Sequence, residues 1–150
     1  MKHEDWMRLA LNQAEKAAED DEVPIGAVIV QNGQVLSIAH NQKEQEQDPT
    51  AHAEIIAIRR AAEAVGHWRL SEAVLYVTLE PCPMCAGAII QSRIKHLVYG
   101  ANDPKGGAVE SVAKLLRDSL WNHKVEITAG VLEEECSILL KNYFKRKRTC

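Results

Sequence analysis

The segment VLYVTLEPCPMCAGAIIQSRIKHLVY, residues 74–99, contains three successive patterns that together indicate the fold class. Residues 74–79 are mostly apolar, which is typical of a buried strand, and residues 94–99 show the same kind of pattern. Between them, residues 84–91 favour a helix. A strand, a helix and a strand in this order predict parallel pairing of the two strands, and therefore an α/β fold.

The residues before this segment predict a helix and a β-hairpin. Residues 4–20 place apolar side chains three and four positions apart, which is the period of an amphipathic helix. Residues 25–30 and 35–39 are rich in β-branched side chains and are separated by Asn32-Gly33, a dipeptide that favours a tight hairpin turn. We therefore expect these two strands to pair antiparallel.

A polar loop and a second helix should follow the hairpin. Residues 41–49 are all polar apart from a proline, which predicts a loop. Thr50 is a candidate N-cap for an alanine-rich helix over residues 53–65. Gly66 comes directly after that helix, where glycine commonly ends helices.

The C-terminal third completes an α/β pattern. Residues 101–107 predict a loop from their Asn, Asp, Pro and Gly content, and residues 109–116 can be helical. Residues 125–129 predict a final strand and residues 132–146 a final helix. The sum is one domain with a three-layer αβα architecture, in which helices cover both faces of a five-stranded mixed sheet.

Composition and charge agree with one globular domain. The chain has 150 residues, of which 46% are hydrophobic and 26% charged, far from the composition of disordered chains. Its net charge of -3 gives no general attraction to nucleic acid or to a membrane surface. No segment has the apolar length of a membrane span or of a secretory signal, so we expect a cytoplasmic protein. Four cysteines in such a protein indicate metal ligands or thiols rather than disulfides.

Three side chains have the pattern of a catalytic zinc site. Cys82 and Cys85 are three residues apart at an expected helix start, so their sulfur atoms should lie on one face. A Cys-x-x-Cys motif alone would fit buried thiols or a redox pair equally well. Together with His52, the two cysteines give three protein ligands and leave the fourth tetrahedral position open for water. We therefore predict one Zn²⁺ per chain.

Glu54 is the candidate catalytic residue beside this site. Hydrolysis by an activated water needs a group that takes the proton of the water and hands it to the leaving nitrogen. Side chains two positions apart, such as His52 and Glu54, point to different sides of a regular helix. Both can reach one metal only if the metal lies beyond the helix end. The predicted reaction is hydrolytic removal of an amino group from a nitrogen heterocycle.

The chain resembles the zinc-dependent cytidine/deoxycytidylate deaminase superfamily, and within it the bacterial tRNA adenosine deaminases. The His-x-Glu and Pro-Cys-x-x-Cys signature matches residues 52–54 and 81–85. The likeness covers nearly the whole chain, at residues 23–28, 41, 48–54, 75–82, 99–101, 103, 105, 107 and 125–128. It implies a cytidine-deaminase-like fold and a single catalytic domain over residues 1–150. It also implies conversion of adenosine to inosine at wobble position 34 of tRNA.

The resemblance implies roles for further residues and for partners. Asn41 would hydrogen-bond the target base, and Asp103 would meet the sugar next to it. We expect Asn41 to act on the substrate alone, so that its replacement leaves the melting temperature nearly unchanged. Because the related enzymes act as homodimers on the tRNA anticodon loop, a homodimer and a tRNA partner are implied here.

The last predicted helix ends in a basic cluster that has two interpretations. Its members are Lys141, Lys145, Arg146, Lys147 and Arg148. Cations at a helix C-terminus complement the helix dipole, and they would also bind RNA phosphates. An exposed Tyr143 or Phe144 could stack on a splayed base, and Phe144 is our candidate for substrate binding. Cys150 is expected to be a free thiol.

Two alternative functions remain open from the sequence. One is a deaminase of free guanine, cytosine or nucleosides, which would need the same metal and the same carboxylate. The other is an RNA-binding module stabilised by zinc. Glu54 argues against this module, because a structural zinc needs no proton shuttle.

Overall fold

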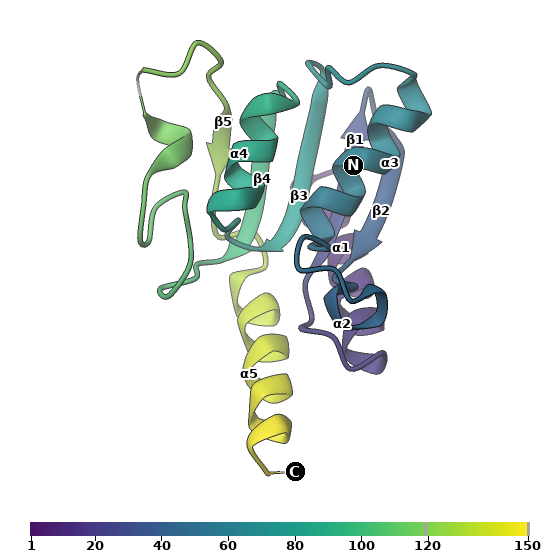
Figure 1. Cartoon of the computed structure of the whole chain (residues 1–150), viewed down its shortest axis with the longest axis vertical. Coiled ribbons are helices and arrows are strands. Elements are labelled where there is room, and N and C mark those ends of the chain that lie inside the picture. The colour runs from purple at the N-terminus through teal and green to yellow at the C-terminus, as the bar shows by residue number, and fades with distance from the viewer. Residues whose placement is uncertain (119, 150) are drawn as a thin grey trace.

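The structure is a computed structural model that describes residues 1–118 and 120–149. Five strands form one sheet in the order β2-β1-β3-β4-β5 (Figure 1). The strands are β1 (Gly26–Gln31), β2 (Gln34–His40), β3 (Ala73–Leu79), β4 (His96–Ala101) and β5 (Glu126–Thr128). The helices are α1 (His3–Glu19), α2 (Lys43–Glu46), α3 (Ala53–Val65), α4 (Pro83–Gln91), the 3₁₀ helix η1 (Leu115–Arg117) and α5 (Glu133–Thr149).

The pairing of the strands confirms the mixed sheet. β1 pairs antiparallel with both β2 and β3, whereas β3 with β4 and β4 with β5 are parallel. The β1–β2 turn is made by Asn32 and Gly33 with φ angles of 52° and 74°, the left-handed conformation that this dipeptide favours. The hairpin and the parallel crossover are therefore both as predicted.

Helices cover both faces of the sheet, as the three-layer prediction requires. Successive residues of a strand point to opposite faces, and β1 shows this clearly. Ala27 and Ile29 pack in a core with α3 and α4, whereas Val28 and Val30 pack in a second core with α1. α5 contributes Cys136 to that second core. The layers are visible in Figure 1, where α5 extends beyond the sheet.

Two local predictions are wrong, and each fails because of a buried carboxylate. Residues 41–49 contain α2, whose first amides at Glu44 and Gln45 donate to the carboxylate of Glu22 at 3.0 and 2.7 Å. Residues 109–116 form turns rather than a helix, with only the short η1 at their end. Amides of this segment donate instead to the carboxylate of Glu80.

The predicted cap of α3 is also wrong. α3 starts at Ala53, so the N-cap position belongs to His52 and not to Thr50. Thr50 instead donates from its amide and its hydroxyl to Asp48, at 2.8 and 2.7 Å. Cys150, expected to be a free thiol, lies outside the described residues.

None of the helices within residues 1–118 and 120–149 has the length and apolar character that crossing a membrane requires.

Candidate active site

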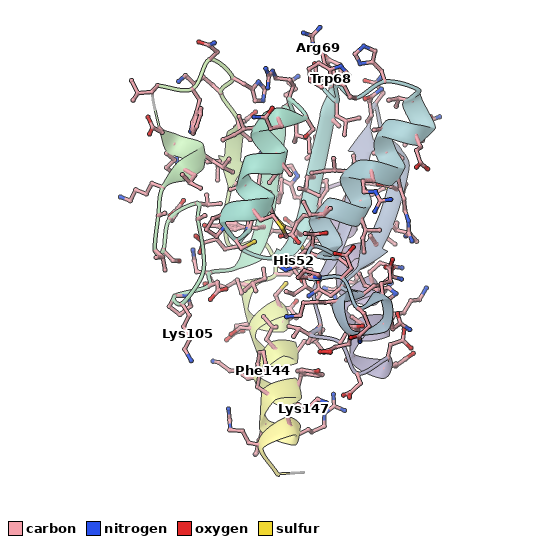
Figure 2. All side chains as sticks on the ribbon, viewed as in Figure 1. His52, Trp68, Arg69, Lys105, Phe144 and Lys147 are labelled. Atoms are coloured by element: carbon pink, nitrogen blue, oxygen red, sulfur yellow. The ribbon has the colours of Figure 1, made fainter. Side chains whose placement is uncertain are left out.

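The predicted metal ligands come together where two helices begin. His52 is the N-cap residue of α3 and Cys82 is the N-cap residue of α4, with Cys85 in the first turn of that helix. β3 leads directly into α4, and proline at the first helical position suits a helix start. Figure 2 shows His52 below the lower ends of both helices, at the end of the sheet nearer to α5.

The three side chains have the geometry of a tetrahedral metal site. Nδ1 of His52 lies 3.6 Å from Sγ of Cys82 and 3.6 Å from Sγ of Cys85. Zinc–sulfur and zinc–nitrogen bonds of about 2.3 and 2.0 Å at tetrahedral angles place these atoms about 3.5 Å apart. Among the described residues, this is the one group of three His, Cys, Asp or Glu side chains that could hold a metal ion. The ligand set fits zinc with one coordination position open.

The electrostatics of the cysteine pair also suit a metal ligand set. Hydrogen bonds from Cys85 and His52 outweigh burial and lower the pKa of Cys82 to about 4. The hydrogen bond to Cys82 and burial both raise the pKa of Cys85, while the hydrogen bond to Cys82 raises the pKa of His52. One thiolate is therefore already favoured before a metal binds, and the thiolate is the form that metals bind.

Glu54 lies beside this group and is almost fully buried, with 4% of its surface exposed. Burial raises the pKa of Glu54 to about 7. Its Oε1 atom is buried and has no hydrogen-bond partner within the described part of the chain. A buried carboxylate oxygen without a partner is costly, so it indicates a position for a ligand or a water. His52 and Glu54 converge because His52 precedes the helix, with ψ of 150°, rather than lying within it.

Asn41 reaches the same place from the end of β2, and its role is larger than the sequence indicated. Its side chain is 6% exposed, and Oδ1 accepts a hydrogen bond of 2.8 Å from the amide of Ala53. Asn41 thus caps α3 from another element, in place of the expected cap by Thr50. The expectation that it acts on the substrate alone is wrong. Nδ2 makes no hydrogen bond to any of the described residues, so the donor side of the amide remains available.

A cavity of about 650 Å³ opens next to these residues. Its walls come from several separate stretches of the chain, represented by Asn41, His52, Leu79, Asp103, Lys105 and Phe144. The α5 residues Lys141 and Arg148 also border it. Figure 2 shows Phe144 and Lys105 on the same side of His52, below the sheet. All three predicted substrate-binding residues, Asn41, Asp103 and Phe144, therefore line one cavity.

The two aromatic residues of α5 differ in exposure. Phe144 is 43% exposed and lines the cavity, as expected for a stacking residue. Tyr143 is 6% exposed, and its hydroxyl donates to the carbonyl of Asp21 at 3.2 Å. Tyr143 therefore anchors α5 to the end of α1, and the suggestion that it is exposed is wrong.

Glu80 was missed by the sequence reasoning. It is 2% exposed and lies between β3 and Cys82, with six donors around its carboxylate. Burial raises the pKa of Glu80, but the hydrogen bonds from Glu110, Ser111 and Asp103 outweigh burial and lower it to about 2. The sequence does contain one signal for Glu80, because it is a charged residue directly after a predicted buried strand.

Comparison with known proteins decides the family. The sequence profile of the MafB19-like deaminases matches residues 1–148. A tRNA-specific adenosine deaminase of Bacillus subtilis is 51% identical over 143 residues, covering 95% of this chain and 89% of that protein. The chain belongs to the tRNA-specific adenosine deaminase family. This family membership fits a site in which a candidate proton carrier lies beside three candidate metal ligands.

Solved structures place this deaminase in the same fold as enzymes with two kinds of substrate. A structure from studies of A-to-I editing by tRNA:A34 deaminases has a TM-score of 0.88 and 50% identity, covering 91% of this chain and 99% of that one. Guanine deaminase from Nitrosomonas europaea has a TM-score of 0.79 and 25% identity, covering 93% and 83%. The deaminase fold is therefore common to both, and the substrate is a separate question.

Proposed function

We propose that this protein is a zinc-dependent hydrolase that converts adenosine to inosine at wobble position 34 of tRNA. The observation that carries the proposal is the buried, unpartnered Oε1 of Glu54 beside His52, Cys82 and Cys85. This arrangement suits hydrolytic deamination, and the family membership favours adenosine in tRNA as the substrate.

His52, Cys82 and Cys85 would hold the zinc ion. When bound, zinc supplies Lewis-acid chemistry that makes water nucleophilic near neutral pH. The rest of the proposed reaction depends on the chain itself. Water adds at the carbon that bears the amino group, the carbon–nitrogen bond breaks, and ammonia leaves.

Glu54 would carry the proton in this reaction. Its carboxylate takes a proton from the attacking water and gives a proton to the leaving nitrogen, so that no proton is gained or lost overall. A pKa raised to about 7 by burial suits a group that must accept and return a proton near neutral pH. The unpartnered Oε1 is free to make these contacts.

Asn41 would hold the target base, and two variants separate this role from its structural one. Asn41→Asp keeps an acceptor for the amide of Ala53 but loses the Nδ2 donor. Asn41→Ala loses both. We expect Asn41→Ala to lower the free energy of unfolding by about 1 kcal/mol, the typical value of an N-cap. We expect Asn41→Asp to retain stability, and both variants to lower kcat/KM on RNA about 5-fold or more, since a lost substrate hydrogen bond costs about 1–3 kcal/mol.

Urea unfolding and single-turnover assays on an anticodon stem-loop measure the two effects separately. The base-binding role would be refuted if Asn41→Asp, with zinc bound, deaminated the stem-loop at the rate of the unmodified protein.

The surface around the cavity suits an RNA loop. The net charge of -3 leaves binding to local basic residues, and Lys105, Lys141 and Arg148 all border the cavity. Phe144 lies among them with an exposed ring that can stack on an unpaired base. Asp103 also lines this cavity and would contact a sugar hydroxyl of the RNA.

One assay tests the proposed substrate against its rival. The purified zinc-loaded protein is incubated with an anticodon stem-loop carrying A at position 34, with a matched loop carrying G there, and with free adenosine, guanine and cytosine. Inosine at position 34 of the first RNA is the expected product. The fold shared with a guanine deaminase favours free guanine as the second candidate, and ammonia from guanine alone would support it.

We also propose that two copies pair through the groove between α3 and α4. This groove encloses about 560 Å³ and is lined mainly by apolar residues, among them Ile55, Ile58, Ala62, Trp68 and Ala88. Trp68 is 53% exposed there, and a large exposed apolar patch commonly marks an interface. Sedimentation equilibrium should give twice the chain mass of 16.7 kDa. We propose a cytoplasmic location, where the tRNA substrate would be available.

A further inference from the structure

The loop over residues 102–111 contributes residues 102–105 to the lining of the cavity and is organised around Glu80. Oε1 of Glu80 accepts hydrogen bonds from Nδ2 of Asn102 at 3.1 Å, from the amide of Asp103 at 3.0 Å and from the hydroxyl of Ser111 at 2.5 Å. Oε2 accepts from the amides of Val109, Glu110 and Ser111 at 3.0, 2.8 and 3.0 Å. One carboxylate thus holds both ends of the loop.

Backbone hydrogen bonds of Glu80 and Pro81 connect the region of this loop to the chain that carries the candidate metal ligands. The amide of Glu80 donates to the carbonyl of Ala101 at 2.8 Å, and the carbonyl of Pro81 accepts from Ala108 at 2.8 Å. Cys82 is the next residue after Pro81. The loop and the candidate metal site are therefore connected through one short stretch of chain, residues 80–82, which begins with Glu80.

Gly107 shows how closely the loop wraps around the carboxylate. A Cβ atom at this position would lie 2.3–2.4 Å from the carboxyl atoms of Glu80, so any side chain there would force the carboxylate or the loop to move. The amide of Gly107 also donates to the carbonyl of Asp103 at 2.9 Å. The backbone of the loop itself contacts the carboxylate, so a change at Glu80 acts directly on that backbone.

Two residues of the cavity wall depend on this arrangement. Asp103 and Lys105 line the cavity, and Oδ1 of Asp103 accepts from the amides of Lys105 and Gly106 at 3.1 and 3.2 Å. Asp103 is held in turn by the hydrogen bond that its own backbone amide donates to Glu80. The backbone at both positions is thus held, directly or through Asp103, by a carboxylate that does not line the cavity.

We infer that Glu80 is a positioning residue that fixes Asp103 and Lys105 at the cavity wall for substrate binding. The inference rests on the proposed function for its kinetic consequence, but not for its effect on the loop. Since the donors of the loop need an acceptor on both carboxyl oxygens, an amide in place of the carboxylate would set its NH₂ group against other donors.

The experiment compares Glu80→Gln with Glu110→Gln, a control that removes a carboxylate from the same loop. Glu110 is exposed and pairs through its side chain with Arg117, so its replacement leaves the acceptor of the loop intact. Hydrogen exchange of the amides of residues 103 and 109–111 is measured without RNA. Zinc content, kcat and KM for the anticodon stem-loop are measured in parallel.

We expect Glu80→Gln to speed amide exchange at these positions and to raise KM about 10-fold or more, with zinc content retained and kcat changed much less. Glu110→Gln should match the unmodified protein. Unchanged exchange, or a loss of kcat or zinc at constant KM, overturns the inference, because a merely structural role lowers the active fraction without changing KM.

A milder variant covers the case in which Glu80→Gln does not fold. Ser111→Ala removes one donor and leaves the carboxylate in place, so it should change exchange and KM in the same direction by a smaller factor. No change in either would contradict the inference. If the unmodified protein does not act on the stem-loop, the proposed function fails, while the exchange measurement still decides whether Glu80 holds the loop.

Discussion

Glu54→Gln is expected to remove nearly all deamination while leaving one zinc ion per chain. The variant keeps the size of the side chain but cannot take a proton from water. Loss of a general acid–base group costs about 10²–10⁴-fold in rate, so kcat on the anticodon stem-loop should fall by at least that range. Stability should not fall, since the replaced carboxylate is buried with an unpartnered oxygen, and an amide avoids the cost of a buried charge.

Rapid-quench kinetics, metal analysis and thermal unfolding measure these three properties. Glu63→Gln is the matched control, because Glu63 lies on the same helix α3 but is exposed, and it should retain the parent rate. A Glu54→Gln protein that lost its zinc would show that Glu54 acts as a metal ligand instead of a proton carrier.

Cys85→Ala is expected to lose zinc, activity and a large part of the stability together. Only two ligands, His52 and Cys82, would remain. A ligand present at about 1,000 times its Kd stabilises a fold by about 4 kcal/mol, which is a fall of roughly 10 °C in Tm for a chain of this size when the ligand is lost.

Cys136→Ala provides the control for removing a buried thiol. Cys136 is 1% exposed and packs in the core on the opposite face of the sheet, with α1. The Cys136→Ala variant should keep one zinc per chain and the activity of the unmodified protein. Metal analysis and calorimetry, each with and without added zinc, test the pair of variants. A Cys85→Ala protein with unchanged Tm and zinc content would contradict the metal assignment.

Hydrophobic pattern and turn chemistry were sufficient for most of the fold. The pattern of residues 74–79 and 94–99, separated by a predicted helix, favoured two buried strands, and Asn32-Gly33 specified a turn through its left-handed backbone. These are properties of neighbouring residues, so they can be read without the rest of the chain. The five strands, their mixed pairing and the helices on both faces followed from them.

The group that could hold a metal was also predictable, because its signals are local. His52 and Glu54 belong to one helix start, and Cys82 and Cys85 belong to another. The spacing within each pair identifies ligand and carboxylate types, and an α/β topology brings helix starts to one end of the sheet. The structure adds the 3.6 Å separations of the Nδ1 and Sγ atoms and the burial of Glu54.

Only the tertiary structure decided what holds the loops and caps. The sequence placed the cap of α3 at Thr50 and a helix over residues 109–116, whereas Asn41 caps α3 from β2 and Glu80 gathers the amides of the second segment. In both cases a backbone group bonds to a side chain far away in the sequence. Local propensity is worth a few tenths of a kcal/mol per residue, so a buried carboxylate or amide that satisfies several donors outweighs it. The sequence by itself determined the five strands, the main helices and the candidate ligand types, and long-range hydrogen bonds determined how the loops that line the cavity are held.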